Sequence, residues 1–230
     1  MKRRKFLKNS TLGSAAVLSA GPLVSCKNAT TPEPQPLTAT GGPIAICTWD
    51  FGNATARAWE VLRGGGTALD AVEAGVMVEE ADPENQTVGL GGRPDRDGHV
   101  TLDACIMDSR GNCGAVMGLE GVVHAISVAR KVMEKTPHVM LAGEGALKFA
   151  LEMGFQKENL LTEKARKIWL YWKQSLSQDD DWLTPPDEDL DPDVRSFFGR
   201  PTGTIHCAAM NRNGELSCVT TTSGLFFKLP

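Results

Sequence analysis

A glycine–threonine step near the end of the chain is the first candidate for chemistry. Gly203 and Thr204 lie in "GRPTGTIHCAAM", directly after an acidic stretch broken by prolines. A threonine hydroxyl inside a chain is a weak nucleophile, because it is not ionised near neutral pH and needs a base beside it. Cutting the Gly203–Thr204 bond would free an α-amino group with a pKa of about 7.7–8.0, which can act as that base. The step suggests a self-cleavage junction, although a β-branched threonine also suits the start of a strand.

The N-terminal segment has the layout of an export signal. Residues 1–26 begin with cationic "KRRKFLK", continue through a short, weakly apolar stretch and end in "LVSC". Arg3 and Arg4 resemble the pair of a twin-arginine signal, and Cys26 resembles the cysteine that is lipidated in a lipoprotein. An ordinary secretory signal with an unrelated cysteine is the alternative. We therefore expect a periplasmic or cell-envelope lipoprotein held to the membrane by its lipid, with residues 27–42 as a flexible tether.

Composition sets aside several kinds of protein. The 24 basic and 28 acidic residues give a net charge of −4, and no basic patch follows the first eight residues, so a nucleic-acid partner is not expected. The five cysteines after Cys26 lack CxxC spacing, which predicts neither a zinc site nor a full disulfide framework. No metal or cofactor is expected. Cys105 and Cys207 lie in apolar runs and are predicted to be small core residues.

Hydrophobic periodicity predicts strands and helices in blocks, which favours an α+β fold with antiparallel sheets between helices. Thr67 and Asp70 have the spacing of a helix N-cap and its partner. The expected strands are 43–51, 99–108, 113–121, 138–143, 203–211 and 215–224, and the expected helices are 53–66, 67–83, 125–137, 145–154 and 162–176. By organisation, residues 43–176 form a first part, 177–203 an acidic linker that leads to the cleavage site, and 204–230 the start of a second part.

Several motifs along the chain identify a resemblance. "TWDFG", "GGTALDAVEAGV", "VGLGGRPDRDGHVTLDACIMD", "ISVARKVMEKTPHVML", "GFQKENLLT" and the final "GTI" through "TTSG" are similar to motifs of the N-terminal-nucleophile asparaginase family, and most similar to its glycosylasparaginase branch. They occur in the family's order and extend from about residue 43 to residue 230. The resemblance implies an αββα sandwich, autoproteolysis into α and β subunits, and hydrolysis of an asparagine-type side-chain amide without a cofactor. It also suggests a dimer of αβ pairs.

The resemblance assigns roles to six residues besides Gly203. Thr204 matches the nucleophile, and Thr222 matches the threonine that contacts it. Four others match residues that bind the substrate or support the site: Trp49 and Phe51 in the aromatic wall of the pocket, Thr87 as a hydrogen-bonding hydroxyl, and Asp103 as the aspartate of "LDA" near the cleavage site. Each of these four side chains would also suit a core, turn or loop position.

Three features depart from the family pattern. Glycosylasparaginases usually carry aspartate where this chain has Gly203, which plant-type asparaginases and isoaspartyl peptidases share, and His206 replaces a usual glycine. The chain ends at Pro230, where the family's substrate-binding "GRVGDS"-like motif would begin, so the chain as it stands is expected to be nearly inactive. The leading hypothesis is an amidohydrolase that converts N-linked glycoasparagine to aspartate and a glycosylamine. The alternatives are an isoaspartyl peptidase or L-asparaginase, and a non-catalytic lipoprotein relative.

Overall fold

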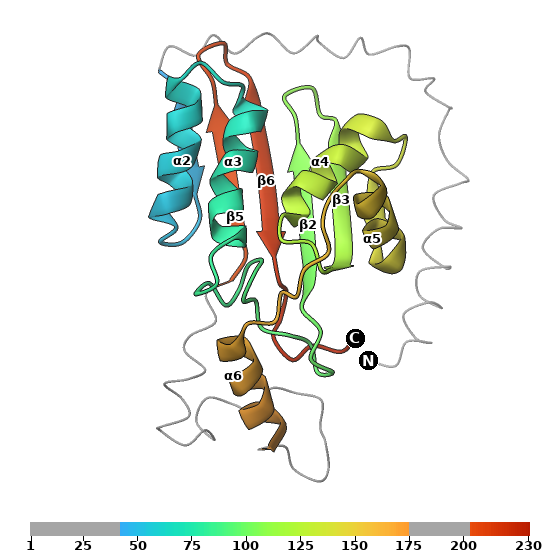
Figure 1. The fold of residues 1–230 in the computed structure, drawn as a ribbon. Coiled ribbons are helices and arrows are strands. Elements are labelled where there is room, and N and C mark those ends of the chain that lie inside the picture. The colour runs from blue at the N-terminus through green and yellow to red at the C-terminus, as the bar shows by residue number, and fades with distance from the viewer. Residues whose placement is uncertain (1–41, 175–202) are drawn as a thin grey trace, which may run out of the picture. The chain divides into compact units, whose positions relative to one another are not determined.

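The computed structural model describes residues 42–174 and 203–230 (Figure 1). The predicted signal with Cys26, nearly all of the tether, and the acidic linker up to residue 202 lie outside the described residues. Both residues of the candidate Gly203–Thr204 cleavage site are described, together with the strand that follows them.

Six strands form one sheet, in the order β1-β5-β6-β2-β3-β4. The strands are β1 (Ile44–Cys47), β2 (Thr101–Met107), β3 (Cys113–Glu120), β4 (Met140–Ala142), β5 (Ile205–Met210) and β6 (Leu216–Thr222). Both predicted hairpins, β2–β3 and β5–β6, are confirmed as antiparallel pairs. The expectation of wholly antiparallel pairing is wrong at one edge, where β4 runs parallel to β3. A helix lies between these two strands in the chain, and such a crossover returns the chain in the same direction.

Five helices accompany the sheet in the described part of the chain: α2 (Gly52–Arg63), α3 (Ala68–Glu80), α4 (Ala125–Lys135), α5 (Gly143–Glu152) and α6 (Glu163–Gln174). The predicted cap of α3 is confirmed, since the Thr67 hydroxyl accepts a hydrogen bond of 3.1 Å from the Asp70 amide. In α2 the buried residues Ala54, Ala58 and Leu62 recur every four residues, which places them on one side of the helix. Periodicity therefore located these helices correctly.

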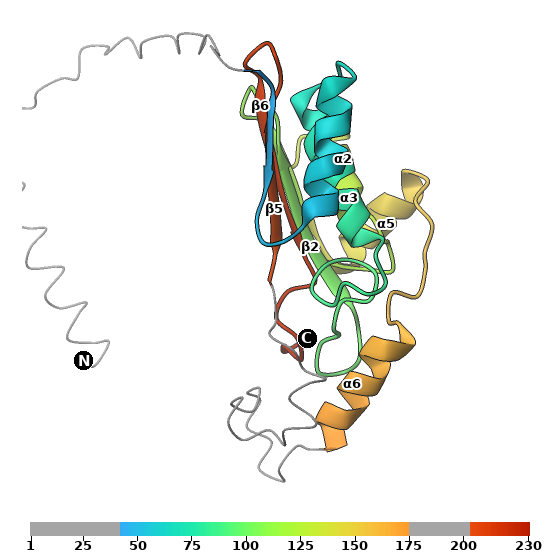
Figure 2. The same cartoon turned by 90° about the vertical axis from the view of Figure 1, so that its left-hand side faces the viewer.

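The helices α2, α3, α4 and α5 cover one face of the sheet, as the two views show (Figures 1 and 2). Small side chains allow close packing there. A Cβ added to Gly75 in α3 would stand 2.9 Å from the Ala54 carbonyl oxygen of α2 and 3.1 Å from the Ala58 Cβ. The core beneath these helices is built mainly from alanine, valine, leucine and isoleucine. The α+β class predicted from the sequence is thus confirmed.

The other face of the sheet carries no helix among the described residues (Figure 2). Apolar side chains on this face are well exposed, for example Ile46 at 62% and Leu216 at 58%. Strand alternation also places Cys105 of β2 on this helix-free face, where it is exposed. The prediction that Cys105 is a core residue is therefore wrong, whereas the same prediction for Cys207 is confirmed because Cys207 is 0% exposed.

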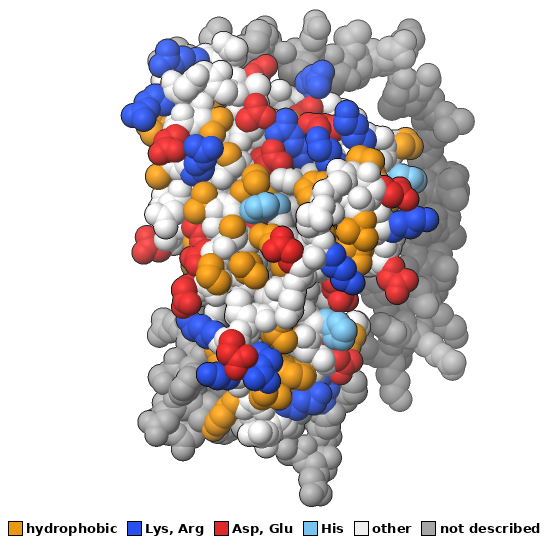
Figure 3. Space-filling view, in the orientation of Figure 1, with side chains coloured by type: hydrophobic (Ala, Val, Ile, Leu, Met, Phe, Trp, Pro, Cys, Tyr) orange, Lys and Arg blue, Asp and Glu red, His pale blue; other side chains and the backbone are white. Residues whose placement is uncertain are grey.

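The surface over the helices mixes charges of both signs. Figure 3 looks onto this side of the molecule, and acidic and basic side chains lie interspersed among apolar ones. Helix α6 lies beyond the end of the sheet, where the Trp172 and Phe227 rings stack with their centroids 4.2 Å apart. Among residues 42–174 and 203–230, no helix combines the length and the apolar character needed to cross a membrane.

Candidate functional site

Strand register brings three of the sequence-predicted residues together. In the β2–β6 pair, Asp103 lies opposite Thr222, and in the β5–β6 pair Ile205 lies opposite Thr221. Extending the second register by one residue places Thr204 opposite Thr222. Directly opposed residues have Cβ atoms about 4.5–5.5 Å apart. Alternation puts Asp103 and Thr222 on the helix-free face, and continuing it along β5 puts Thr204 there too. Asp103, Thr222 and Thr204 therefore form a row across β2, β6 and the start of β5.

The end of β1 holds the backbone of the junction. The Trp49 indole Nε1 donates a hydrogen bond of 3.1 Å to the Thr204 carbonyl oxygen, and the Thr48 hydroxyl lies 3.4 Å from the same atom. The Thr48 hydroxyl also accepts a hydrogen bond of 2.9 Å from the His206 amide. The Trp49 ring lies beside Gly203, because a Cβ built there would be 3.8 Å from the Trp49 Cζ2 atom. Trp49 and the junction, far apart in sequence, are thus direct neighbours.

The backbone of Trp49 adopts a conformation that is rare for a large side chain. Its φ of 57° lies in the left-handed region, and its side chain is 63% exposed. Non-glycine residues remain in that region where surrounding contacts hold them, and the cost is of order 1–3 kcal/mol. The hydrogen bond from the indole to Thr204 is a contact of this kind. The strained backbone therefore directs an aromatic side chain at the junction.

Thr222 is held through the backbone of Thr87. The Thr222 hydroxyl donates to the Thr87 carbonyl oxygen at 3.4 Å and accepts from the Gly224 amide at 2.9 Å. The Thr87 carbonyl also accepts a hydrogen bond of 2.8 Å from the Ser223 amide. The Thr87 hydroxyl itself donates to Asn85 Oδ1 at 3.1 Å. Thr87 thus meets Thr222 through its main chain, while its side chain stabilises its own loop.

Asp103 and Phe51 have clear structural contacts as well. The Asp103 carboxylate accepts a hydrogen bond of 2.8 Å from the Gly118 amide, beside an irregularity in the β2–β3 pairing. Phe51 occupies the N-cap position of α2 and is half-buried against the core. Of the residues predicted for the site, Phe51 is therefore the one whose described packing is with the core.

Two residues near the site, one lysine and one threonine, were not predicted from the sequence. Lys228 donates a hydrogen bond of 2.7 Å to the Ser223 carbonyl oxygen. Burial lowers the pKa of Lys228, while the negative charges of Asp103 and Asp95 act in the opposite direction. Thr48 is the second residue, through its contacts with Thr204 and His206. A lone lysine and a threonine beside a tryptophan have no distinctive spacing. The turn after β6 brings Lys228 to Ser223, and the pairing of β1 with β5 brings Thr48 to Thr204.

His206 also gains a physical explanation. Its ring Nδ1 lies 2.9 Å from the Thr220 hydroxyl oxygen, its cross-strand partner in β6. This pair occupies the register position next to Thr204 and Thr222, on the same helix-free face. The imidazole therefore fills the space beside the junction that a glycine would leave open.

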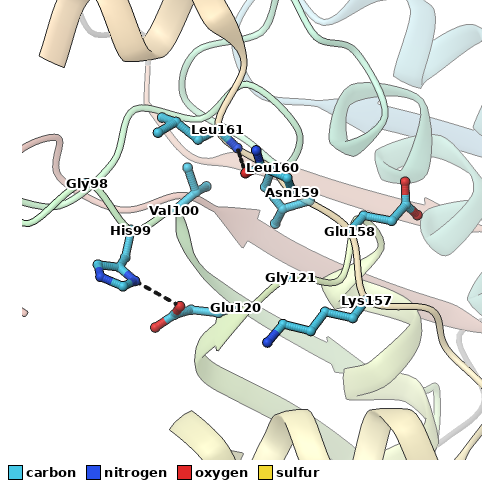
Figure 4. Close-up of a pocket in the computed structure, with 10 residues that line it drawn as sticks. All are labelled: Gly98, His99, Val100, Glu120, Gly121, Lys157, Glu158, Asn159, Leu160 and Leu161. Carbon is cyan, nitrogen blue, oxygen red and sulfur yellow. Dashed lines mark hydrogen bonds and ion pairs between the residues drawn. The ribbon is translucent and has the colours of Figure 1, made fainter. Parts of the chain in front are cut away.

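One surface groove of the described chain is separate from the predicted site residues. A surface groove of about 450 Å³ is lined by residues of 98–100, 120–121 and 157–161, and none of the predicted site residues belongs to it (Figure 4). Within it His99 Nδ1 and Glu120 Oε2 face each other at 3.2 Å, and both side chains are about half exposed. No group of three or more histidine, cysteine or acidic side chains within the described ranges is arranged to hold a metal ion.

Residues 36–230 match the asparaginase family, and the chain belongs to that family. The resemblance stated from the sequence motifs is thereby confirmed, and the mixed sheet covered by helices on one face is consistent with the αββα fold that the family implies. Two relatives are both named N(4)-(beta-N-acetylglucosaminyl)-L-asparaginase. The protein from Elizabethkingia miricola is 46% identical over 99% of this chain and 62% of its own length. The protein from Rattus norvegicus is 40% identical over 82% of this chain and 59% of its own length. The chain thus spans about three fifths of these relatives.

Proposed function

We propose that Thr204 is the nucleophile of an autoprocessing amidohydrolase that cleaves N-linked glycoasparagine to aspartate and a glycosylamine. The observation that carries the proposal is the row of Thr204, Thr222 and Asp103 across three neighbouring strands, with the Trp49 indole on the Thr204 carbonyl. The printed names of the relatives from Elizabethkingia miricola and Rattus norvegicus support the substrate class.

The first step of the proposed chemistry is the cut itself. The Thr204 hydroxyl oxygen attacks the Gly203 carbonyl carbon and loses its proton, and the Gly203–Thr204 amide bond breaks as the Thr204 nitrogen takes up a proton. Water then hydrolyses the resulting ester and releases the Gly203 carboxylate. Glycine suits position 203 because it tolerates backbone conformations that other residues avoid. Thr48 and Trp49 hold the Thr204 carbonyl, which keeps the reacting hydroxyl at a fixed position relative to β1.

The same hydroxyl then acts on substrate. The free α-amino group of Thr204 takes the hydroxyl proton, and the oxygen attacks the carbonyl carbon of the substrate's side-chain amide. The amide C–N bond breaks, the glycosylamine leaves with that proton, and a β-aspartyl ester remains on Thr204. Water hydrolyses the ester and frees aspartate. The Thr222 hydroxyl lies opposite Thr204 and would donate a hydrogen bond to the reacting oxygen once its proton turns away from the Thr87 carbonyl.

Gly203 favours a second candidate within the same chemistry. Plant-type asparaginases and isoaspartyl peptidases share glycine at this position, so an isoaspartyl or free asparagine side chain is the alternative substrate. The non-catalytic relative considered from the sequence becomes the conclusion if neither cleavage nor amide hydrolysis occurs.

Location and assembly complete the proposal. Arg3, Arg4 and Cys26 support export followed by lipid anchoring, so we place the protein in the periplasm or cell envelope. The family relationship supports a dimer of αβ pairs.

The test uses the full-length protein and mass spectrometry under denaturing and reducing conditions. Wild type should yield a fragment that begins Thr204-Ile205-His206, and Thr204→Ala should remain a single chain. Thr136→Ala, at the C-terminal end of α4, serves as the matched control and should be cut like wild type. An uncut wild type would overturn the mechanism. On the cut protein, release of glycosylamine from a glycoasparagine, compared with release of ammonia from asparagine, distinguishes the two substrate classes.

A further inference from the structure

Two cysteines face each other across the first strand pair of the sheet. Cys47, the last residue of β1, lies directly opposite Cys207 of β5. Both side chains point to the helix-covered face, where Cys207 is fully buried and Cys47 half-buried. The Cys207 sulfur lies close to α3, since a Cβ added to Gly75 would be 3.6 Å from it. The pair therefore sits at the boundary between the sheet and the helices.

The register gives this pair a geometry that suits a covalent bond. The next residues along, Thr48 and His206, are joined by a backbone hydrogen bond of 2.9 Å from the Thr48 amide to the His206 carbonyl. In antiparallel pairing such positions alternate, so Cys47 and Cys207 occupy a non-hydrogen-bonded position. Residues there have Cα atoms about 4.5 Å apart, and disulfides span Cα separations of about 4.4–6.8 Å. No large movement of the backbone is needed to join the two sulfurs.

The two thiols also differ in how easily they lose a proton, which gives them different roles in disulfide exchange. The Cys207 thiol donates a hydrogen bond to the Cys47 sulfur, and this contact is the main reason why the pKa of Cys47 is lowered to about 7. Desolvation and the charge of Glu79 oppose that shift, and a hydrogen bond from Thr55 adds to it. The pKa of Cys207 is raised by its contact with Cys47 and by burial. Cys47 is thus the attacking thiolate and Cys207 the thiol that completes the exchange.

We propose that Cys47 and Cys207 form an interstrand disulfide. The oxidant is a disulfide-bearing molecule, either a small one or a protein. The Cys47 thiolate attacks one of its sulfurs, the oxidant's S–S bond breaks, and one thiol leaves. The Cys207 sulfur then loses its proton and attacks the Cys47 sulfur, which releases the second thiol. Two protein thiols are oxidised and one external disulfide is reduced to two thiols.

The other described cysteines provide an internal comparison. Cys105 lies opposite Thr220 and Ala115, Cys113 opposite Met107, and Cys218 opposite Met107 and Ala208. Cys47 and Cys207 are therefore the one pair of described cysteines that share a register position. We expect the bond to be selective for this pair.

The bond has a specific consequence that rests on the proposed function. Cys47 precedes the Gly203–Thr204 junction and Cys207 follows it. After the cut, the disulfide would link the two pieces covalently, three residues beyond the new N-terminus. The pieces would then separate under denaturing conditions only when a reductant is present.

The test is peptide mapping of the full-length chain. The protein is reduced, freed of reductant, incubated with oxidised glutathione in native buffer, alkylated in denaturant and digested without reduction. We expect the Cys47 and Cys207 peptides as one species, lighter than their sum by two hydrogens and separated by reductant. In Cys207→Ala, Cys47 should accumulate as a mixed disulfide with glutathione. Cys105→Ala is the matched control and should form the Cys47–Cys207 species as wild type does.

Three results would overturn the inference: alkylated Cys47 and Cys207 after oxidation, glutathione retained on Cys47 in wild type, or Cys47 bonded to another cysteine. The mapping succeeds or fails independently of the cut, because the bond is sought within whichever chains are present. A cross-linked but uncut wild type would reject the proposed function and keep the disulfide. A cut protein whose pieces separate without reductant would reject the disulfide and keep the proposed cleavage.

Discussion

Thr221 donates a hydrogen bond of 2.7 Å to the carboxylate of Glu80, on the face of β6 opposite to that of Thr222. Glu80 is fully buried at the end of α3 and also accepts a hydrogen bond of 3.1 Å from the Ile126 amide. Its other carboxylate oxygen lies 3.4 Å from His124 Nδ1. Neighbouring residues of one strand thus serve different tasks: Thr221 fixes β6 to the helices, while Thr222 faces the junction.

The first prediction concerns this anchor. Replacing Thr221 with valine removes a donor from a buried carboxylate, which should lower the free energy of unfolding by about 1–3 kcal/mol. Thr221→Ser retains the hydroxyl and should recover most of the loss. Urea denaturation of the two variants and wild type measures the difference. A valine variant as stable as wild type would show that the hydrogen bond to Glu80 does not carry the effect, and a loss confined to the serine variant would assign it to the methyl group.

The second prediction is a dependence of stability on pH. Burial raises the pKa of Glu80, although hydrogen bonds from His124, Thr221 and the Ile126 amide act against that shift. Because the folded-state pKa is raised, the native state binds more protons than the unfolded state from about pH 4.5 upward. This contribution to stability is therefore present at low pH and is lost as the pH rises through the folded-state value. Glu80→Gln should flatten the curve.

Denaturation midpoints between about pH 4.5 and pH 8 measure this effect. Glu152→Gln, on the exposed side of α5, is the matched control and should keep the slope of wild type. An unchanged slope in Glu80→Gln would mean that the pKa of Glu80 is the same in the folded and unfolded states.

The third prediction concerns the junction. Trp49→Phe keeps an aromatic ring but removes the indole donor to the Thr204 carbonyl. Loss of one hydrogen bond of about 1 kcal/mol should slow the cut about fivefold. The rate at which the fragment beginning at Thr204 appears measures it. Trp59→Phe, on α2, is the control and should cut at the rate of wild type, and a matching slowdown there would point to a general loss of packing.

The fourth prediction is that replacing glycine with alanine has opposite effects on stability at two helical positions. Gly75→Ala should destabilise the fold by about 1–3 kcal/mol, because the new Cβ would press on the Ala54 carbonyl of α2. Gly145→Ala, in α5, meets nothing within 4 Å and should stabilise by about 0.5–1 kcal/mol through helix propensity. Thermal or urea denaturation tests both, and destabilisation by Gly145→Ala would contradict this explanation.

Local chemistry explains what could be predicted from the sequence. The Thr67–Asp70 cap, the buried stripe of α2 and both hairpins follow from interactions between residues near in sequence. The motif around Thr204 predicts a cleavage junction, which stays a prediction.

The features that could not be predicted from the sequence depend on pairing between segments that are distant in the chain. The parallel edge strand β4, the exposed position of Cys105 and the opposition of Cys47 to Cys207 all depend on which strands become neighbours. Glu80 is an intermediate case: it continues the four-residue spacing of Val72 and Val76 in α3, so periodicity places it on the buried side, but its partners come from β6 and α4.

The strand order has a consequence for biosynthesis. The strands β5 and β6 are made after every other described strand, yet they occupy the middle of the sheet, between β1 and β2. While the ribosome is still translating the first two hundred codons, β1 has no neighbour and β2 lacks one of its two. Pairings this distant in sequence form slowly and leave strand edges open in the meantime. The sheet therefore cannot close until the β5–β6 hairpin has been synthesised, and until then the nascent chain depends most on protection from aggregation.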